Sequence, residues 1–505
     1  MSKWIKLAQD WELLPISNGI ELRHGEKSLD LEVPTNEEVS ELKSALKGDV
    51  DLTTSSNPDI LSLVDHLLSE SAIEVVEIKP TQYSKSSEEK ILCSLRSSFV
   101  GSDSYIKAVY RPDPRNLSFP LLTSHIFSAK YADSAGNEDW SSGLDDSKSL
   151  AEIKAIMEGL ERVASGILPT NDVLYTTGKS LGPKVLDPRR VVEYSTEQYR
   201  HVQLKTFSLT KHYYWQKVFR VSDSQAFYLP VECIYYPISQ RFTPNVYTYA
   251  NSSGIAAGLN FESALFEALT ELIERDAFML TWINRLVHTK ISKAHLTDSQ
   301  KARVTNVNTA GYEVEIVNIT LDLLPTVLVV AHSTKLKPSL ILGMSCKPTV
   351  SAAISKALSE VEQQLYWKLR QGQELYSIDN QTMVSTISDH SAIYVSGKHL
   401  HEAEFLWSGT DSTRFLEGDG RYDQLDTVLE LLNTRNIETY ALDLSPFAMK
   451  SSGVYVVRAI AEGLVPISFG YGLEPLAMKR LKSVPEKLGL KINSWQDGVF
   501  THPFA

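Results

Sequence analysis

The sequence has few cysteines, fewer basic than acidic residues and no long apolar run, and each of these features argues against a class of protein. Among its 505 residues are three cysteines, none in a CxxC or Cys/His pattern, so neither a disulfide framework nor a zinc module is predicted. The formal net charge of −12 argues against nucleic acid or an anionic membrane as a partner. No apolar stretch approaches the ~20 residues that span a bilayer, and the start MSKWIKLAQDWELLP lacks a signal-peptide pattern. We expect a cytoplasmic protein.

The first 80 residues have the pattern of a small winged-helix-like unit. Alternating apolar and polar residues at 19–33 predict a hairpin, and apolar periodicity predicts helices near 35–48 and 57–68 before a strand at 73–76. Residues 1–80 hold 7 basic and 16 acidic side chains, so DNA would be repelled. A small sheet can instead bind an extended peptide by strand addition. A purely structural appendage is the alternative.

The remainder of the chain predicts a larger α/β domain, in which strand-like and helix-like segments alternate. The polar stretch at 80–90 is expected to be a linker, and the proline-rich stretch at 111–120 an irregular connection. Apolar runs predict buried strands at 312–320, 326–332 and 339–346, followed by a long helix at 349–371. We therefore divide the chain into a winged-helix-like domain (1–85), a connecting region (86–124) and a catalytic domain (125–505).

Two helix-like segments 113 residues apart share the pattern ExxER. The first reads EGLER, with Glu158 and Glu161, and the second reads ELIERD, with Glu271 and Glu274. At ~100° per residue, Glu267 joins the second pair within roughly 60°, while the opposite face of that helix is apolar. Between 251 and 284 the only basic residue is Arg275, so lysines at helical spacing do not balance these carboxylates.

An uncompensated carboxylate cluster is most easily explained by a bound cation. Mg²⁺ prefers oxygen ligands and is commonly held by one or two carboxylates together with substrate phosphates. Arg162 and Arg275 would then contact phosphate or orient the glutamates through i,i+4 pairing. The loop SSGIAAG, which includes Ser253 and Gly254, can bring backbone amides close to a phosphate at a helix start. The alternative is two ordinary amphipathic helices with acidic outer faces.

These motifs together resemble the YcaO family, whose members use ATP to activate peptide backbone amides. The resemblance rests on KAIMEGLER (154–162), SSGIAAGLNFESALFEALTELIERDAF (252–278), KALSEVEQQ (356–364), the segment 441–466 and the tail HPFA, and it covers roughly 125–505. It implies ATP and Mg²⁺ as cofactors. The implied metal ligands are Glu158, Glu161, Glu271 and Glu274, and the implied nucleotide contacts are Arg162, Ser253, Gly254, Glu267, Arg275 and Arg458.

The resemblance also implies a reaction and partners. In the azoline-forming branch of the family a proline-rich C-terminus reaches the active site, which maps here onto His502, Pro503, Phe504 and the carboxylate of Ala505; Pro503 and Ala505 are the predicted catalytic residues. A frayed tail is the alternative. Azoline-forming systems commonly use a winged-helix peptide clamp, here fused to the catalytic domain. A ribosomally made precursor peptide is then the expected substrate, with a ubiquitin-activating-enzyme-like subunit and a flavin dehydrogenase as further partners, in an oligomer that serves bacteriocin-type biosynthesis.

The chain departs from the family pattern at several positions. Ser263 stands where a glutamate is common, the stretch from Gly143 to Asp145 replaces a GKG-like one, and the tail ends in alanine instead of proline. Three alternatives to azoline formation stay open: thioamide formation, amidine formation, and an inactive subunit that binds precursor without chemistry.

Overall fold

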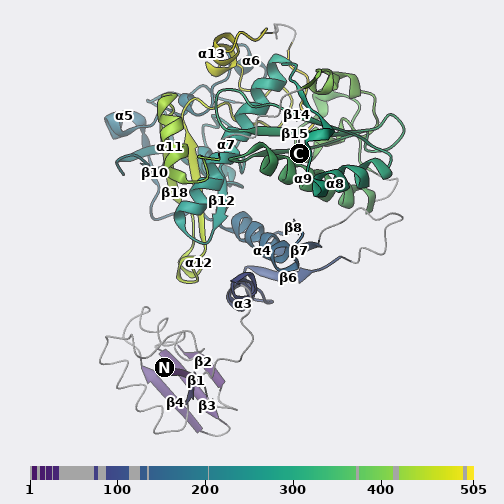
Figure 1. Cartoon of the computed structure of the whole chain (residues 1–505). Coiled ribbons are helices and arrows are strands. Elements are labelled where there is room, and N and C mark those ends of the chain that lie inside the picture. The colour runs from purple at the N-terminus through teal and green to yellow at the C-terminus, as the bar shows by residue number, and fades with distance from the viewer. Residues whose placement is uncertain are drawn as a thin grey trace. The chain divides into compact units, whose positions relative to one another are not determined.

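The chain divides into two compact units, Met1–Ser86 and Ser87–Ala505. The computed structural model describes residues 87–112, 125–133, 136–202, 204–370, 375–412, 420–492 and 498–504, together with the backbone of five strands in the first unit. Figure 1 shows the element order along the chain. No helix in these residues is long and apolar enough to cross a membrane.

The first unit contains two antiparallel sheets. β1 (Lys3–Leu7) pairs with β5 (Ile73–Glu77), and β2 (Glu12–Ile16), β3 (Gly19–His24) and β4 (Lys27–Glu32) form a meander. The predicted hairpin at 19–33 is confirmed by the β3–β4 pairing, and the predicted strand at 73–76 by β5. The two predicted helices, 35–48 and 57–68, lie outside the described residues.

The second unit begins with a helix where a linker was predicted. α3 (Ser87–Phe99) starts inside the stretch 80–90, and its buried Leu95 and Phe99 share a core with α4 (Lys148–Ser165). The linker prediction was therefore wrong for residues 87–90. The prediction rested on the polarity of this stretch. Its acidic residues Glu88 and Glu89 instead occupy the first helical turn, where negative charge stabilises a helix by interacting with its dipole. Most of the proline-rich stretch 111–120 lies outside the described residues.

Three sheets, with mostly antiparallel strands, form the framework of the described part of this unit. β6 (Ile106–Tyr110), β7 (His125–Ala132) and β8 (Glu138–Asp145) make the first. The second has the order β11-β10-β18-β19-β12, with β9 also on β10, and consists of β9 (Leu174–Thr177), β10 (His212–Arg220), β11 (Ala226–Pro230), β12 (Ile255–Gly258), β18 (Thr439–Asp443) and β19 (Tyr455–Ala461).

The third sheet has the order β16-β15-β14-β13-β17 and carries the predicted buried strands. β14 (Glu313–Asn318), β15 (Thr326–His332) and β16 (Leu340–Cys346) confirm the three predicted strands, and α9 (Val350–Arg370) confirms the predicted long helix. β13 (Lys290–Ile291) and β17 (Asp411–Ser412) pair in parallel at the edge. α9 and α8 (Asp298–Thr309) bury their apolar sides against one face of this sheet.

α7 (Phe261–Asn284) joins the second and third sheets. Ala264, Leu265, Ala268, Leu269 and Ile273 are buried, which confirms the predicted apolar face. Beyond Arg275 the helix is buried all round, from Asp276 to Asn284. The smaller helices are α5 (Gly178–Leu181), α6 (Gln198–His201), α10 (Ile387–Ala392), α11 (Leu425–Thr434), α12 (Phe447–Ser451) and α13 (Arg480–Lys487).

A buried ion triad fixes α7 to α13. Arg480 donates from Nη2 to Asp276 Oδ2 at 2.7 Å and to Asp322 Oδ1 at 2.8 Å. Asp276 also accepts from the Val465 amide at 2.8 Å. The three side chains are between 2% and 11% exposed, so the guanidinium neutralises two carboxylates with little solvent around them.

We predict that Arg480→Met lowers the free energy of unfolding by about 3–5 kcal/mol, because it leaves two buried carboxylates unpaired. Urea unfolding followed by circular dichroism measures the loss. Arg200→Met is the matched control, since Arg200 and its partner Glu197 are 66% and 63% exposed; an exposed pair contributes less than about 1 kcal/mol. Equal midpoints for the two variants would contradict the role given to the triad.

Candidate functional site

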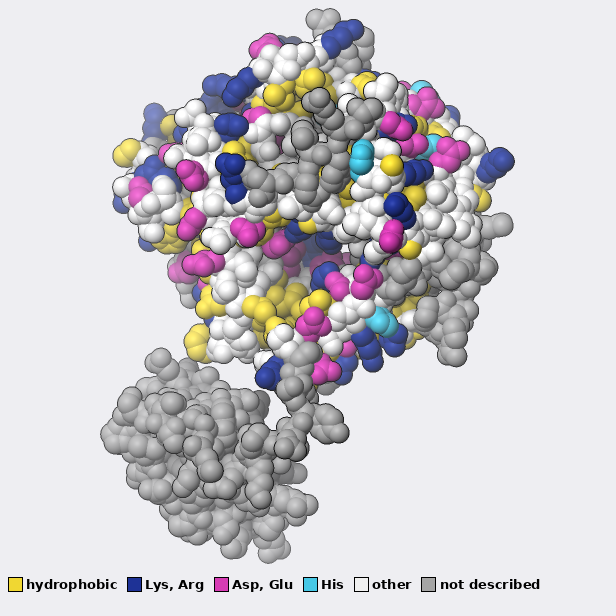
Figure 2. Space-filling view, in the orientation of Figure 1, with side chains coloured by type: hydrophobic (Ala, Val, Ile, Leu, Met, Phe, Trp, Pro, Cys, Tyr) yellow, Lys and Arg dark blue, Asp and Glu magenta, His cyan; other side chains and the backbone are white. Residues whose placement is uncertain are grey.

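α4, α7 and α9 meet around a cavity of about 780 Å³, which we call the carboxylate cavity. Figure 2 shows a hollow on this face of the molecule, with acidic and basic side chains around it. All four glutamates predicted as metal ligands line the cavity, as do three of the predicted nucleotide contacts: Glu158, Glu161, Glu271, Glu274, Arg162, Glu267 and Arg275. Side chains more than 100 residues apart in the sequence are therefore brought to one place.

Two of the three helices around the cavity, α4 and α9, lie unusually close to a strand. A Cβ on Gly143 of β8 would fall 2.1 Å from the Ala151 carbonyl oxygen of α4, and one on Gly343 of β16 would fall 2.1 Å from the Ala357 carbonyl oxygen of α9. Only glycine permits this approach. Gly143 belongs to the stretch that departs from the family's GKG-like pattern, and the structure gives it a packing role.

The close approach lets strand amides hold the carboxylates. Five glutamates of the site each accept a backbone N–H through one oxygen, so their side chains have fixed directions. The donors and distances are Ser142 to Glu158 at 3.0 Å, Gly254 to Glu271 at 3.2 Å, Cys346 to Glu274 at 2.9 Å and Met344 to Glu360 at 3.2 Å, and Ala257 donates to Glu161.

Burial raises the pKa of several carboxyl groups in the cavity, and for two of them neighbouring carboxylates contribute. Burial raises the pKa of Glu161 to about 8, and the charges of Glu271 and Glu158 add to the effect. Burial likewise raises the pKa of Glu274 to about 8, with Glu360 and Glu271 contributing, and it raises the pKa of Glu271 itself. The arginines oppose these shifts but do not cancel them, so the cavity favours an added positive charge.

The two arginines are only loosely engaged. Arg162 Nη2 lies 3.5 Å from Glu158 Oε1, and Arg275 Nη2 lies 3.6 Å from Glu271 Oε1, as the i,i+4 spacing predicts. Arg275 Nε has no hydrogen-bond partner among the described residues. Both guanidinium groups therefore keep donors that an anionic ligand in the cavity can use.

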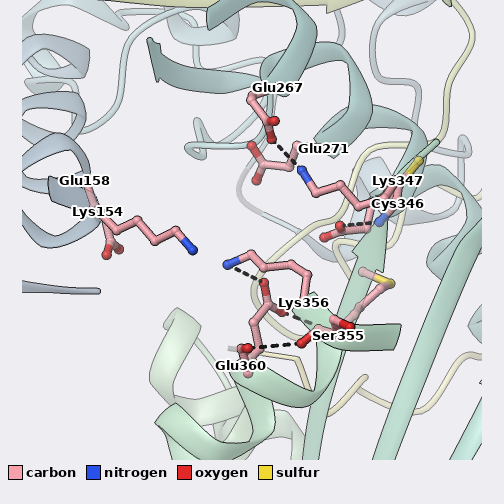
Figure 3. A network of polar contacts seen from close by, with 12 residues as sticks. Lys154, Glu158, Glu267, Glu271, Cys346, Lys347, Ser355, Lys356 and Glu360 are labelled. Atoms are coloured by element: carbon pink, nitrogen blue, oxygen red, sulfur yellow. Dashed lines mark hydrogen bonds and ion pairs between the residues drawn. The ribbon is translucent and has the colours of Figure 1, made fainter. Parts of the chain in front are cut away.

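Sequence reasoning missed one glutamate on a third helix and two lysines that pair with acidic side chains of the cavity. Glu360 of α9 lines the cavity and pairs with Lys356 Nζ at 3.4 Å, while Lys347 Nζ lies 2.7 Å from Glu267. Figure 3 shows these side chains, with Lys154 extending from α4 toward Lys356. The stretch KALSEVEQQ contains Lys356 and Glu360 and was the available signal.

Three other predicted nucleotide contacts lie outside the carboxylate cavity. Arg458 and Ser253 line a smaller cavity of about 70 Å³ instead. Arg458 donates to the carbonyl oxygens of Asn251 and Cys233, both at 3.0 Å, and burial lowers its pKa to about 10, against the opposing charge of Glu271. Gly254 takes part through the amide that holds Glu271. None of these three residues therefore lines the cavity that contains the glutamates.

The C-terminal tail is buried from Thr501 to Phe504, which excludes a frayed tail for these residues. His502 Nε2 donates to the Ser468 carbonyl oxygen at 2.7 Å, and His390 Nδ1 donates to the His502 carbonyl oxygen at 2.9 Å. The Phe504 ring centroid lies 5.1 Å from the Arg275 guanidinium. Pro503 is buried but does not line the carboxylate cavity, and Ala505 lies outside the described residues.

Ser263, one of the departures from the family pattern, has a structural role at the start of α7. Its amide donates to Asn260 Oδ1 at 2.7 Å, and its hydroxyl lies 3.4 Å from the Asn260 amide nitrogen, which completes a capping box. The helix that carries Glu267, Glu271 and Glu274 therefore begins securely without a glutamate at position 263.

The donor set of the carboxylate cavity fits a magnesium–phosphate group better than a bare metal ion. Within the described part of the chain, no three acidic, histidine or cysteine side chains are close enough to hold a metal by themselves. Each glutamate offers a hard oxygen not occupied by a backbone amide, and the arginines and lysines can reach phosphate oxygens. Carboxylates and phosphates together would complete the coordination.

We predict that Glu161→Gln gains stability relative to the natural protein as pH rises from 5.5 to 8.5 in the presence of a chelator. The folded pKa of Glu161 is raised from 4.5 to about 8, so the folded state binds more protons than the unfolded state in this interval and loses stability as they dissociate. Glutamine cannot ionise and avoids this loss. Urea unfolding at several pH values tests this, with the exposed Glu262→Gln as control; a pH-independent difference for Glu161→Gln would contradict it.

Comparison with known proteins assigns the family. Residues 142–465 match the family described as YcaO cyclodehydratase, ATP- and Mg²⁺-binding. A Methanothermobacter thermautotrophicus protein of undescribed activity is 26% identical over 299 residues, which cover 55% of this chain and 69% of that protein.

Two solved structures have a similar fold. A heterocyclase in complex with substrate and cofactor superposes with a TM-score of 0.65 and 20% identity over 96% of this chain, which spans 63% of the heterocyclase. YcaO from Methanopyrus kandleri bound with AMPPCP and Mg²⁺ superposes with a TM-score of 0.55 and 14% identity, covering 77% of this chain and 94% of the other. The α/β fold prediction is confirmed. Since the match to the family includes the carboxylate cavity and covers more than half of the sequence, the chain belongs to the YcaO family, whose cofactors are ATP and Mg²⁺.

Proposed function

We propose that this protein is an ATP- and Mg²⁺-dependent cyclodehydratase that converts cysteine, serine or threonine of a ribosomally made precursor peptide to an azoline. The observation that carries the proposal is the meeting of the two ExxER helices at one cavity. Membership of a cyclodehydratase family and a fold similar to that of a heterocyclase support it.

In this proposal the glutamates hold magnesium and the basic side chains hold phosphate. Glu158, Glu161, Glu271 and Glu274 would each give Mg²⁺ the oxygen that no strand amide holds. Arg162 and Arg275 would contact phosphate oxygens, and the neighbouring Lys347 and Lys356 would add positive charge. Glu267 would position Lys347. Ser253 and Arg458 line the smaller cavity, and Gly254 donates its amide to Glu271; all three remain proposed nucleotide contacts.

The reaction proposed is a dehydration driven by phosphoryl transfer. The substrate side chain attacks the carbonyl carbon of the preceding residue, and the carbonyl oxygen becomes an oxyanion. ATP supplies the phosphoryl group that converts this oxygen to a leaving group. Phosphate then departs as the amide nitrogen loses its proton and the C=N bond forms. The balance is peptide plus ATP to azoline peptide, ADP and phosphate. Arg162 and Arg275 would stabilise charge that grows on the transferring group.

The base is proposed to be the C-terminal carboxylate. A carboxylate shielded from water has a raised pKa and becomes a better proton acceptor. The burial of Pro503 and Phe504 supports this role, and the Phe504 ring packs against Phe278 of α7. The contact between Phe504 and Arg275 links the tail to the phosphate-binding side of the cavity.

The first unit is proposed to hold the leader of the precursor. Its three-stranded sheet β2-β3-β4 has two edge strands, which can pair with an extended peptide. A held leader raises the local concentration of the core peptide at the active site. The further partners proposed are a ubiquitin-activating-enzyme-like subunit and a flavin dehydrogenase. The proposal also keeps the domain limits 1–85, 86–124 and 125–505.

We predict that the full chain with Mg-ATP removes ~18 Da from its precursor per ring and releases ADP and phosphate. Mass spectrometry distinguishes this from a gain of ~16 Da, which would indicate a thioamide, and from an unchanged peptide with intact ATP, which would indicate an inactive subunit.

Glu271→Lys should lower turnover by more than about 100-fold, the magnitude of losing one electrostatic contact in a transition state. Glu262→Lys on the exposed first turn is the control. ATP hydrolysis retained in Glu271→Lys would refute the site assignment.

We predict that removal of residues 502–505 abolishes turnover and leaves ATP binding largely intact. Because this deletion also removes buried His502 and Phe504, a second variant should carry a C-terminal amide made by protein ligation. It keeps every side chain and lacks only the carboxylate, so turnover should fall while the unfolding midpoint stays constant. Full activity of the amide would exclude the carboxylate as the base.

A further inference from the structure

A second cleft shares Ser142 with the carboxylate cavity and lies on the face of the first sheet that points away from α4; we call it the aromatic cleft. It has a volume of about 440 Å³ and is lined by Tyr110, Ser128, Trp140, Ser142 and Trp367. This volume falls in the range of about 300–1,000 Å³ typical of ligand pockets. Ser142 also lines the carboxylate cavity, so one residue borders both spaces.

The sheet register explains why these residues share a face. Tyr110 of β6 pairs with Ser128 of β7, which pairs with Ser142 of β8, and side chains on paired residues lie on the same side. Ser141 points the other way, because its hydroxyl donates to the Ala155 carbonyl oxygen of α4 at 2.7 Å. Trp140 therefore lies on the cleft side with Ser142.

The last turns of α9 close this face. Tyr366 packs with Ile126 and Leu144, and Trp367 packs against the same group. The packing places the Trp367 indole at the cleft, opposite strands β7 and β8. The cleft is thus walled by aromatic side chains from two separate parts of the chain.

Two polar groups in the cleft lack partners. Ser128 is 2% exposed, and its Oγ has no hydrogen-bond partner in the described residues. The buried Nε1 of Trp367 likewise has none there. Unpaired buried donors are costly, and both can donate to a carbonyl oxygen. The described lining holds no charged side chain, while Trp140 and Tyr110 are 51% and 47% exposed and leave the cleft open to solvent.

We propose that the aromatic cleft binds the residue of the peptide substrate that directly flanks the reacting cysteine, serine or threonine. Its occupant is an uncharged side chain, aromatic or branched apolar, whose neighbouring backbone carbonyls accept from Ser128 and Trp367. The proposal rests on the proposed function, since it takes the substrate to be a peptide. Continuity through Ser142 gives the reason: a chain with one amide beside Glu158 has its next residue within reach of the cleft.

The test uses synthetic hexapeptides with one cysteine, flanked on one side or the other by phenylalanine or by aspartate. The full chain with Mg-ATP should process the phenylalanine peptide at least tenfold faster in kcat/KM at one of the two flanking positions, since one apolar contact discriminates about 10- to 200-fold. Trp140→Ala should reduce this preference to within about twofold, and Trp140→Phe should restore most of it. Phe447→Ala, which removes an aromatic ring that is 74% exposed, is the matched control.

The outcomes separate the alternatives. Unchanged peptide preference in a folded Trp140→Ala protein would overturn the proposal. A raised KM for ATP with lost preference for ATP over GTP would also overturn it, because the cleft would then hold the nucleobase. Peptide binding is measured separately by tryptophan fluorescence without ATP. Selective binding of the phenylalanine peptide with no mass change would refute the proposed function and support the role of the cleft. A mass change without selectivity would support the proposed function and refute the role of the cleft.

Discussion

The site depends on hydrogen bonds between strand amides and helix carboxylates. Five glutamates on three helices each accept one backbone N–H, from β8, β12, β16 or the residue just before β12. Such a bond is possible only where helix and strand approach closely, as at Gly143 and Gly343. The fold therefore fixes the direction of acidic side chains that would otherwise repel one another and turn toward solvent.

Holding several carboxylates close together is electrostatically unfavourable unless positive charge is bound nearby. Burial, with a smaller contribution from neighbouring carboxylates, raises the pKa of Glu161 and of Glu274, so the charged forms are unfavourable in this cavity. Lys347 and Lys356 neutralise part of this negative charge through their ion pairs with Glu267 and Glu360. The arginines contact their glutamates only at 3.5 and 3.6 Å, so they can turn toward a ligand. A triphosphate with magnesium supplies both signs of charge, which a metal ion alone does not. The family's cofactors match this requirement.

Local periodicity predicted the helices of the site well. The acidic edge and apolar face of α7 follow from the spacing of Glu267, Glu271 and Glu274, and the buried strands β14 to β16 follow from apolar runs. The repeat of ExxER suggested that the two edges meet. Periodicity carries no information on which distant side chain completes a site, so Glu360, Lys347 and the cleft around Trp140 were missed.

The sequence also failed to predict which cavity two side chains would line and where one helix begins. Arg458 and Ser253 line the smaller cavity instead of the carboxylate cavity, and no spacing in the sequence predicts this. α3 was missed because its first turn is polar, although its later residues Leu95 and Phe99 are core. In both cases the local sequence was compatible with more than one structure, and tertiary packing selected one of them.

The central claim is that the two ExxER helices share one magnesium-bound triphosphate. The most direct measurement is a crystal structure of the full chain with a non-hydrolysable ATP analogue and Mn²⁺, located by its anomalous scattering. The account predicts anomalous peaks between the carboxylates of α4 and those of α7, with the triphosphate against Arg162 and Arg275. Metal and phosphates bound elsewhere, with Glu158 and Glu271 facing only water, would contradict it.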